Sequence, residues 1–148
     1  MADLLQILFL VNLNKMSMHV IDDLLTKFTI DDDVPLIFVV KLGNFPLFET
    51  LLRHSTLLEN LDSVFGMAAS EGHMDMIDVL KTNPRVDIHA SNDAAFRLAC
   101  SSGHLKVVEW FLANGANVHA LNDDALYAAS ENHHLDVVHL LVQRGAQF

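Results

Sequence analysis

One segment recurs along this 148-residue chain, and the recurrence limits what the chain can fold into. Each copy opens on an aspartate, and the four openings are Asp33, Asp62, Asp93 and Asp123. They are 29, 31 and 30 residues apart. Residues 62–80, 93–111 and 123–141 align without gaps, and the copy that begins at residue 33 is weaker. A period of this size is typical of an array of repeated supersecondary units.

The start and end of a first helix can be read from each copy. Each opening aspartate precedes an apolar, alanine-rich stretch of about ten residues, where a carboxylate can accept hydrogen bonds from free amides of the first helical turn. We therefore expect the opening aspartates to be N-caps. Gly43, Gly72 and Gly103 end this helix, because glycine adopts a left-handed backbone without strain. His133 replaces the glycine in the last copy, at an expected cost of about 1 kcal/mol.

A second helix follows each of these turns. Apolar residues recur in it at helical spacing, as in Leu105, Val108 and Phe111, and it ends at Gly115 or Gly145. Each unit is thus two short antiparallel helices and a connecting loop. One such unit cannot bury its own apolar face, whereas stacked units can. The sequence therefore predicts an all-α solenoid of stacked helix-turn-helix units.

The chain resembles the ankyrin-repeat family most closely over residues 103–120, which read GHLKVVEWFLANGANVHA. Residues 81–90 read as a variant of the same linker with one extra residue. The resemblance is strong over 62–148, moderate over 31–61 and faint over 1–30. It implies a single ankyrin-repeat domain over 1–148. Its units are a degenerate, cap-like one at 1–30 and repeats at 31–60, 61–90, 91–120 and 121–148.

Two departures from the family pattern change what we expect. The usual Thr-Pro-Leu-His opening is absent, and Arg97 and Tyr127 occupy the column of its histidine, which usually supports the loop. We expect both residues to support the fold rather than to bind. The period is about three residues below the family's usual value of roughly 33, so the projecting finger loops should be short. This short style resembles the ankyrin arrays of large amoeba-infecting DNA viruses, or of amoebal and chytrid genomes.

The resemblance implies a protein-binding function. In ankyrin proteins, the concave surface built from the finger loops and the exposed side of the first helices commonly binds a protein partner. When the family's binding positions are transferred to the equivalent columns of this sequence, the resemblance implies eight partner-binding residues: Ser91, Asp93, Ser101, Ser102, Leu121, Asp123, Glu131 and Asn132. The opening aspartates fall along one edge of this surface, so we expect a partner with a basic or amide-rich surface.

Charge and cysteine content restrict the partners and the location. Nineteen acidic and nine scattered basic residues give a formal net charge of −10, which argues against nucleic-acid binding. The most apolar stretch is far shorter than the roughly 20 residues that span a bilayer, so no membrane contact is expected. Cys100 is the only cysteine, which favours an intracellular location, the cytoplasm, or the host cytoplasm if the protein is viral.

The residues that could carry catalysis are better explained by the repeat. His73, His104 and His134 recur with the unit and should lie near 10 Å apart, too far to ligate one zinc ion at about 2.0–2.3 Å. Cys100 falls in a column of small residues and should be buried and inert. We therefore predict no catalytic residue, no metal and no cofactor. A metal-dependent enzyme is the remote alternative.

The two ends of the chain carry two further expectations. Residues 4–11 are apolar on every side of a helix except at Gln6, and we expect another element to cover them. Residues 4–10 faintly resemble the start of an F-box, so the alternative function is a substrate-recruiting adaptor for a ubiquitin-ligase scaffold. The last helix pair should expose apolar faces that a further repeat would cover, either as a self-association site or as a frayed end.

Overall fold

A computed structural model of the chain describes residue 19, residues 33–55, residue 58 and residues 60–148. Within these ranges all regular secondary structure is helical. The helices are α3 (Val34–Lys41), α4 (Phe45–His54), α5 (Asp62–Glu71), α6 (Met74–Leu80), α7 (Ala90–Ser102), α8 (Leu105–Ala113), α9 (Asp124–Glu131) and α10 (Leu135–Gln143). The predicted all-α class is confirmed. Apart from residue 19, the predicted unit 1–30 lies outside the described residues, as does the F-box-like stretch.

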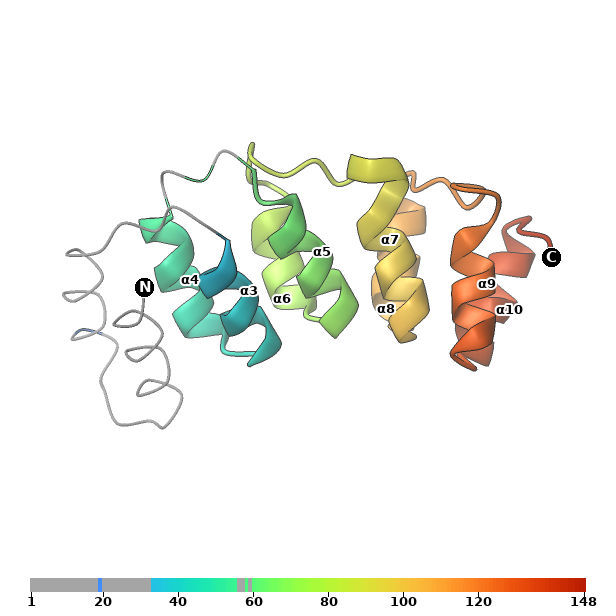
Figure 1. Cartoon of the computed structure of the whole chain (residues 1–148), viewed down its shortest axis with the longest axis horizontal. Coiled ribbons are helices and arrows are strands. Elements are labelled where there is room, and N and C mark those ends of the chain that lie inside the picture. Colours follow the sequence, from blue (N-terminus) through green and yellow to red (C-terminus); the bar gives the residue numbers. More distant parts are fainter. Residues whose placement is uncertain (1–18, 20–32, 56–57, 59) are drawn as a thin grey trace.

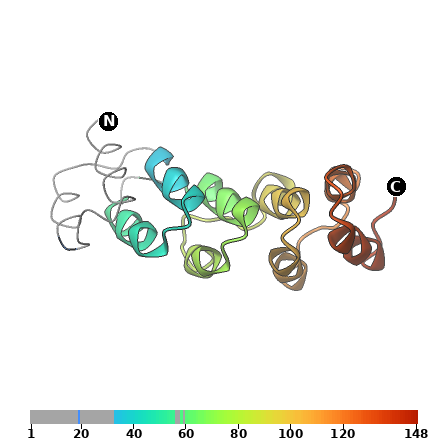
Figure 2. The same ribbon diagram turned by 90° about the horizontal axis from the view of Figure 1, so that it is seen from below.

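The described helices form antiparallel pairs that follow one another along the long axis of the molecule (Figure 1). The first helices of the pairs, α3, α5, α7 and α9, lie in one layer and each contacts the next. Figure 2 shows α4, α6 and α8 in a second layer beside them. The connections between pairs run along one edge, which we call the finger edge, and the tight turns within pairs run along the opposite edge, the turn edge.

Aromatic side chains join one pair to the next in the core. Phe111 of α8 contacts Phe65 of α5 and Phe96 of α7, with ring centroids 5.7 Å and 6.1 Å apart and nearly perpendicular planes. All three rings are buried. Ala99 and Cys100, in the small-residue column of α7, are buried as well and let neighbouring helices approach. The stacked-unit arrangement predicted from the repeat is confirmed.

The glycines predicted to end the first helices have left-handed backbones. The φ angles are 77° at Gly72 and 76° at Gly103, and His133, in the same column, has φ 62°. A second constraint acts on Gly72, because a Cβ atom there would lie 2.6 Å from Nδ1 of His104 in the following unit. The His104 ring is fixed in place by a hydrogen bond from its Nε2 to the carbonyl oxygen of Ser70 (2.8 Å).

The prediction that the opening aspartates are N-caps is right in position for Asp33 and Asp123, which are the N-cap residues of α3 and α9, but neither side chain accepts a capping hydrogen bond. Leu61 rather than Asp62 is the N-cap of α5, and Asp93 lies in a non-helical kink within α7. The backbone of residues 91–93 and of residues 121–123 is left-handed, with φ between 52° and 59°. This conformation turns the carboxylates toward the finger loops and away from the helix amides.

The aspartates instead bind the finger loops. Asp62 Oδ1 accepts from the amide of Asp87 (2.8 Å), and Asp93 Oδ2 accepts from the amide of Asn117 (3.0 Å). Asp93 Oδ1 also accepts from Nδ1 of His89 (2.6 Å), four residues earlier. Each of these carboxylates therefore connects the start of a first helix to the loop that follows the same helix pair.

Candidate functional site

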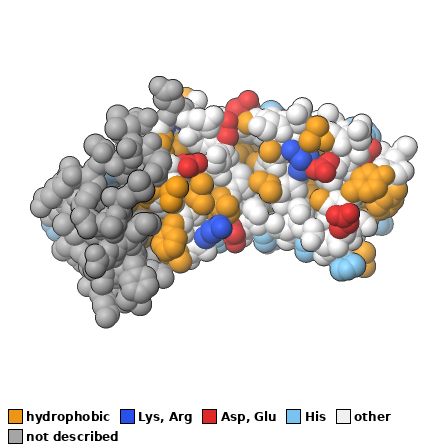
Figure 3. All heavy atoms as spheres, viewed as in Figure 1, with side chains coloured by type: hydrophobic (Ala, Val, Ile, Leu, Met, Phe, Trp, Pro, Cys, Tyr) orange, Lys and Arg blue, Asp and Glu red, His pale blue; other side chains and the backbone are white. Residues whose placement is uncertain are grey.

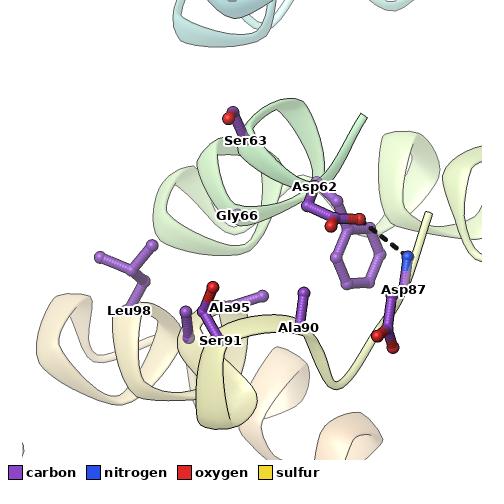
Figure 4. A pocket seen from close by; sticks show the side chains of 10 residues that line it. Asp62, Ser63, Gly66, Asp87, Ala90, Ser91, Ala95 and Leu98 are labelled. Carbon is purple, nitrogen blue, oxygen red and sulfur yellow. Dashed lines mark hydrogen bonds between the residues drawn. The ribbon is translucent and has the colours of Figure 1, made fainter. Parts of the chain in front are cut away.

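The layer of first helices is hollowed between α5 and α7 into a groove of about 220 Å³ (Figure 4). Gly66 of α5 and Ala95 of α7 line its middle, and Leu98 lies at one end. Asp62 and Asp87 lie at the other end, toward the finger edge. The groove thus has an apolar end and an acidic end.

The groove depends on the absence of a side chain at residue 66. In the repeat alignment Gly66 shares a column with Arg97 and Tyr127. A Cβ atom on Gly66 would lie 3.4 Å from Cδ1 of Leu98, so even alanine would narrow the space between the two helices. Gly66 has no left-handed φ, which means that the backbone there does not require glycine.

Hydrogen bonds hold the acidic end of the groove in place. Asp62 Oδ1 accepts from the amide of Asp87, as drawn in Figure 4, and Asp62 Oδ2 accepts from Nδ2 of Asn60 (3.0 Å). Asp87 Oδ1 accepts from the amide of His89 (2.9 Å). No lysine or arginine is among the described residues that line the groove. This end of the groove is therefore lined by two carboxylates and by no lysine or arginine among the described lining residues.

A second groove, of about 290 Å³, lies between α7 and α9. Arg97 crosses it: Nη1 donates to Asp124 Oδ2 (2.8 Å), and Nε and Nη2 donate to the carbonyl oxygens of Asn92 (3.2 Å) and Ser91 (3.3 Å). Arg97 therefore supports the start of its own helix and connects α7 to α9, which confirms its predicted structural role.

Leu98 stands between the two grooves and lines both of them. Its side chain is 43% exposed although the same helix buries Phe96 and Ala99 completely. Figure 3 views this face and shows hydrophobic side chains at the surface of the described part, with few Lys or Arg side chains between them. An exposed leucine flanked by two hollows is suited to contact an apolar group of another molecule.

Four of the predicted site residues lie at the finger edge and differ in accessibility. Ser91 and Leu121 are exposed. Asp93 is only 6% exposed and has both oxygens engaged by His89 and Asn117. Asp123 is half-buried and accepts from Nδ1 of His119 (2.8 Å). Both carboxylate oxygens of Asp93 are thus used for hydrogen bonds within the fold. Ser91 is the member of this group that lines the groove between α5 and α7.

The other predicted site residues lie at the turn edge, on the far ends of the same helices. Asn132 Nδ2 donates to Oγ of Ser101 (3.2 Å), which links α7 to the end of α9. Ser102 shares a hydrogen bond with Ser70 of α5 (3.1 Å), and Glu131 is exposed. Ten residues separate Ser91 from Ser101, about 15 Å along a helix, so the structure does not bring the two groups together.

Sequence reasoning missed the residues that form the grooves themselves. Gly66, Ala94 and Leu98 were not among the predicted site residues, yet they line the space between the predicted groups. Gly66 did carry a signal. A glycine inside a helix destabilises that helix, and nothing in the local sequence explains a glycine at residue 66. That signal points to a site only once Leu98 is known to lie opposite.

The one clearly perturbed ionisable group in the described residues is a core thiol. Burial raises the pKa of Cys100 to about 12, because a thiolate would be poorly solvated between the helices. Cys100 is buried, as predicted, and a thiol with so high a pKa is a poor nucleophile. Among the described residues there is no group of three His, Cys, Asp or Glu side chains that could hold a metal ion. None of the described helices has the length and hydropathy needed to cross a bilayer.

Stacked helix pairs joined by loops along one edge define a helical repeat solenoid. A family model described as "Ankyrin repeats (3 copies)" matches residues 65–148, and the chain belongs to the ankyrin-repeat family. Ankyrin repeats are generally protein-binding modules, and no enzyme family was detected in the chain. A search of curated proteins gave no match.

Proposed function

We propose that this protein binds another protein through the face formed by its first helices and finger loops. The observation that carries the proposal is Leu98, an exposed leucine with a groove on each side. Solenoids present such continuous faces to their partners because each unit adds one helix to the same surface. Of the residues predicted from the sequence, Ser91 and Ser101 border these grooves.

The charge of the chain favours a partner with a basic surface. The formal net charge is −10, and Asp62 and Asp87 face the groove between α5 and α7 without a basic side chain among its described lining residues. Complementary charge speeds association and selects among partners. The same charge disfavours nucleic acid. We place the interaction in the cytoplasm, since a single cysteine favours an intracellular protein.

The test compares two substitutions by aspartate in affinity capture from cells of the source organism. Leu98→Asp puts a charge between the two grooves, and Ala113→Asp puts the same charge at an exposed position of α8, outside both grooves. We expect at least one partner to bind the wild type and Ala113→Asp but to be depleted about tenfold or more by Leu98→Asp. If no captured protein distinguishes Leu98→Asp from Ala113→Asp, the proposed face is not the binding surface.

The exposed side of α10 supports a second candidate, self-association through the last helix pair. Leu135 is 74% exposed and Val142 is 49% exposed, whereas Leu105 and Leu112, in the same columns of α8, are half-buried. Apolar side chains exposed in this way are suited to pack against a second copy. Sedimentation equilibrium of the wild type should show a concentration-dependent dimer that Leu135→Asp abolishes. A monomer at all concentrations would exclude this candidate.

A further inference from the structure

We propose that the groove between α5 and α7 binds an arginine side chain of the partner protein, which enters beside Gly66 and places its guanidinium group against Asp87 and Asp62. This inference rests on the proposed protein-binding function and specifies the chemistry of one contact. Three features of the groove support it: the space left by Gly66, the acceptors at one end, and the apolar wall along its length.

The space beside Gly66 stands out when equivalent positions on α5 and α7 are compared. On α7 the column holds Arg97, whose side chain crosses to Asp124 of α9. On α5 the same column holds Gly66, so no side chain from this position crosses the groove of about 220 Å³ to α7. The column of Asp124 holds Ala94 on α7, so the carboxylates available to an arginine in this groove are those of Asp62 and Asp87.

The acidic end of the groove offers several free acceptors. Within the described residues, Asp87 uses Oδ1 to accept from the amide of His89, and no group donates to its other oxygen. Ser91 also borders the groove, and its hydroxyl group has no hydrogen-bond partner in the described part of the chain. Hydrogen bonds between a guanidinium group and a carboxylate are among the strongest in proteins. Several acceptors at one end of a groove suit the forked donors of arginine better than the single ammonium group of lysine.

An apolar wall runs along the rest of the groove. Leu98, Ala94 and Ala95 line it next to Gly66, so the methylene groups of a long basic side chain can lie against them. A carboxylate-bearing ligand would meet Asp62 and Asp87 and be repelled. A purely apolar ligand would leave the acidic end facing water without a partner. A long side chain that is apolar along its length and cationic at its tip matches both ends.

The structure also predicts that filling the groove has opposite effects on folding and on binding. Gly66 lies within a helix at a position that does not need glycine, and a Cβ atom there would have a terminal methyl group of Leu98 as its nearest neighbour, 3.4 Å away. Gly66→Ala should therefore raise the midpoint of thermal unfolding by about 2–4 °C. The added methyl group narrows the groove and should weaken arginine binding about threefold or more.

The direct test is an NMR titration of the uniformly ¹⁵N-labelled full chain with three acetylated and amidated peptides. Their sequences are Ala-Ala-Arg-Ala-Ala and the same peptide with lysine or norleucine at the centre. We expect the arginine peptide, at up to about 10 mM, to shift the amides of Gly66, Ser91 and Leu98. The lysine peptide should bind about threefold more weakly, and the norleucine peptide should leave these amides unshifted.

Three variants show whether the contact is the one proposed. Gly66→Arg supplies the groove with an arginine of its own and should weaken the peptide about tenfold or more. Asp87→Asn removes the charge but keeps the turn, because Asn117 accepts from the amide of His119 (3.0 Å) just as Asp87 accepts from that of His89. It should weaken the peptide about fivefold. Asp136→Asn, which makes the same change in net charge on α10, should have no effect.

The inference is overturned if the arginine peptide leaves the groove amides unshifted, or if the norleucine peptide shifts them equally. It is also overturned if Asp136→Asn weakens binding as much as Asp87→Asn, because the attraction would then be a property of net charge alone. Should Gly66→Arg not fold, Gly66→Ala and Asp87→Asn decide the result. These outcomes are separate from the proposed function, which stands if Leu98→Asp still removes a captured partner.

Discussion

Two independent constraints act on Gly72, which ends a first helix, and only one of them acts on Gly115, which follows a second helix. Gly72 has φ 77° and leaves room for the His104 ring, whereas Gly115 has φ 88° with nothing within 4 Å of the position of a Cβ atom. Gly72→Ala should therefore cost backbone strain and displace the ring, roughly 3 kcal/mol of unfolding free energy. Gly115→Ala should cost backbone strain alone, about 1 kcal/mol. Urea unfolding of the two variants measures the difference, and equal losses would show that the His104 contact is unimportant.

The buried thiol of Cys100 makes a prediction about pH. Its pKa is raised from 9.0 to about 12 in the folded protein, so above pH 9 the unfolded chain releases a proton that the folded chain keeps. Stability should therefore fall as the pH rises from about 9 toward 12, with Cys100 contributing roughly 1.4 kcal/mol per pH unit. Cys100→Ala lacks this contribution and should show a shallower slope in urea unfolding between about pH 9 and 10.5. Equal slopes for the wild type and the variant would show that Cys100 does not cause the loss of stability above pH 9.

At the scale of the elements, the opening aspartates make the contacts that connect the first helices to the finger loops. Asp93 accepts from His89 and Asn117 and is buried, whereas the side chain of Asp123 has His119 as its one donor among the described residues and is half-buried. Asp93→Ala should cost about 2–3 kcal/mol, because two donors lose their partner, and Asp123→Ala should cost about 1 kcal/mol. Chemical unfolding gives both values. Hydrogen exchange at the Asn117 amide should also speed up in Asp93→Ala alone, and similar effects of the two substitutions would argue against a loop-binding role for Asp93.

The same aspartates show how far the sequence could predict the elements. The repeat period and the glycine column located both helices of each unit, because helix ends follow local rules. The local rule predicted that the Asp93 side chain caps the following helix, whereas its oxygens accept from His89 and Asn117. The left-handed run at 91–93 is held by a hydrogen bond from Asn117, which is 24 residues away in the chain. The groove was missed for a similar reason, since it requires Gly66 of one unit and Leu98 of the next.

At the scale of the whole molecule, the main contacts of each described helix pair are with the pairs before and after it, so the effect of a substitution should depend on its position in the array. Val107 in α8 and Val137 in α10 are equivalent, buried residues, and valine-to-alanine should cost about 2 kcal/mol at either. Val137→Ala should speed hydrogen exchange in α9 and α10 about thirtyfold and leave α5 and α6 unchanged. The reason is that α5 and α6 are separated from α10 by a complete helix pair.

Val107→Ala should reach further, although it removes the same atoms. Within the described chain α9–α10 packs mainly against α7–α8, so weakening α7–α8 should speed exchange in its own helices and in α9 and α10 as well. Hydrogen-exchange mass spectrometry of both variants measures the two patterns on one scale. If Val137→Ala speeded exchange in α5 and α6 as much as in α9 and α10, the molecule would unfold as a single cooperative unit. The stacking of pairs would then not govern its stability.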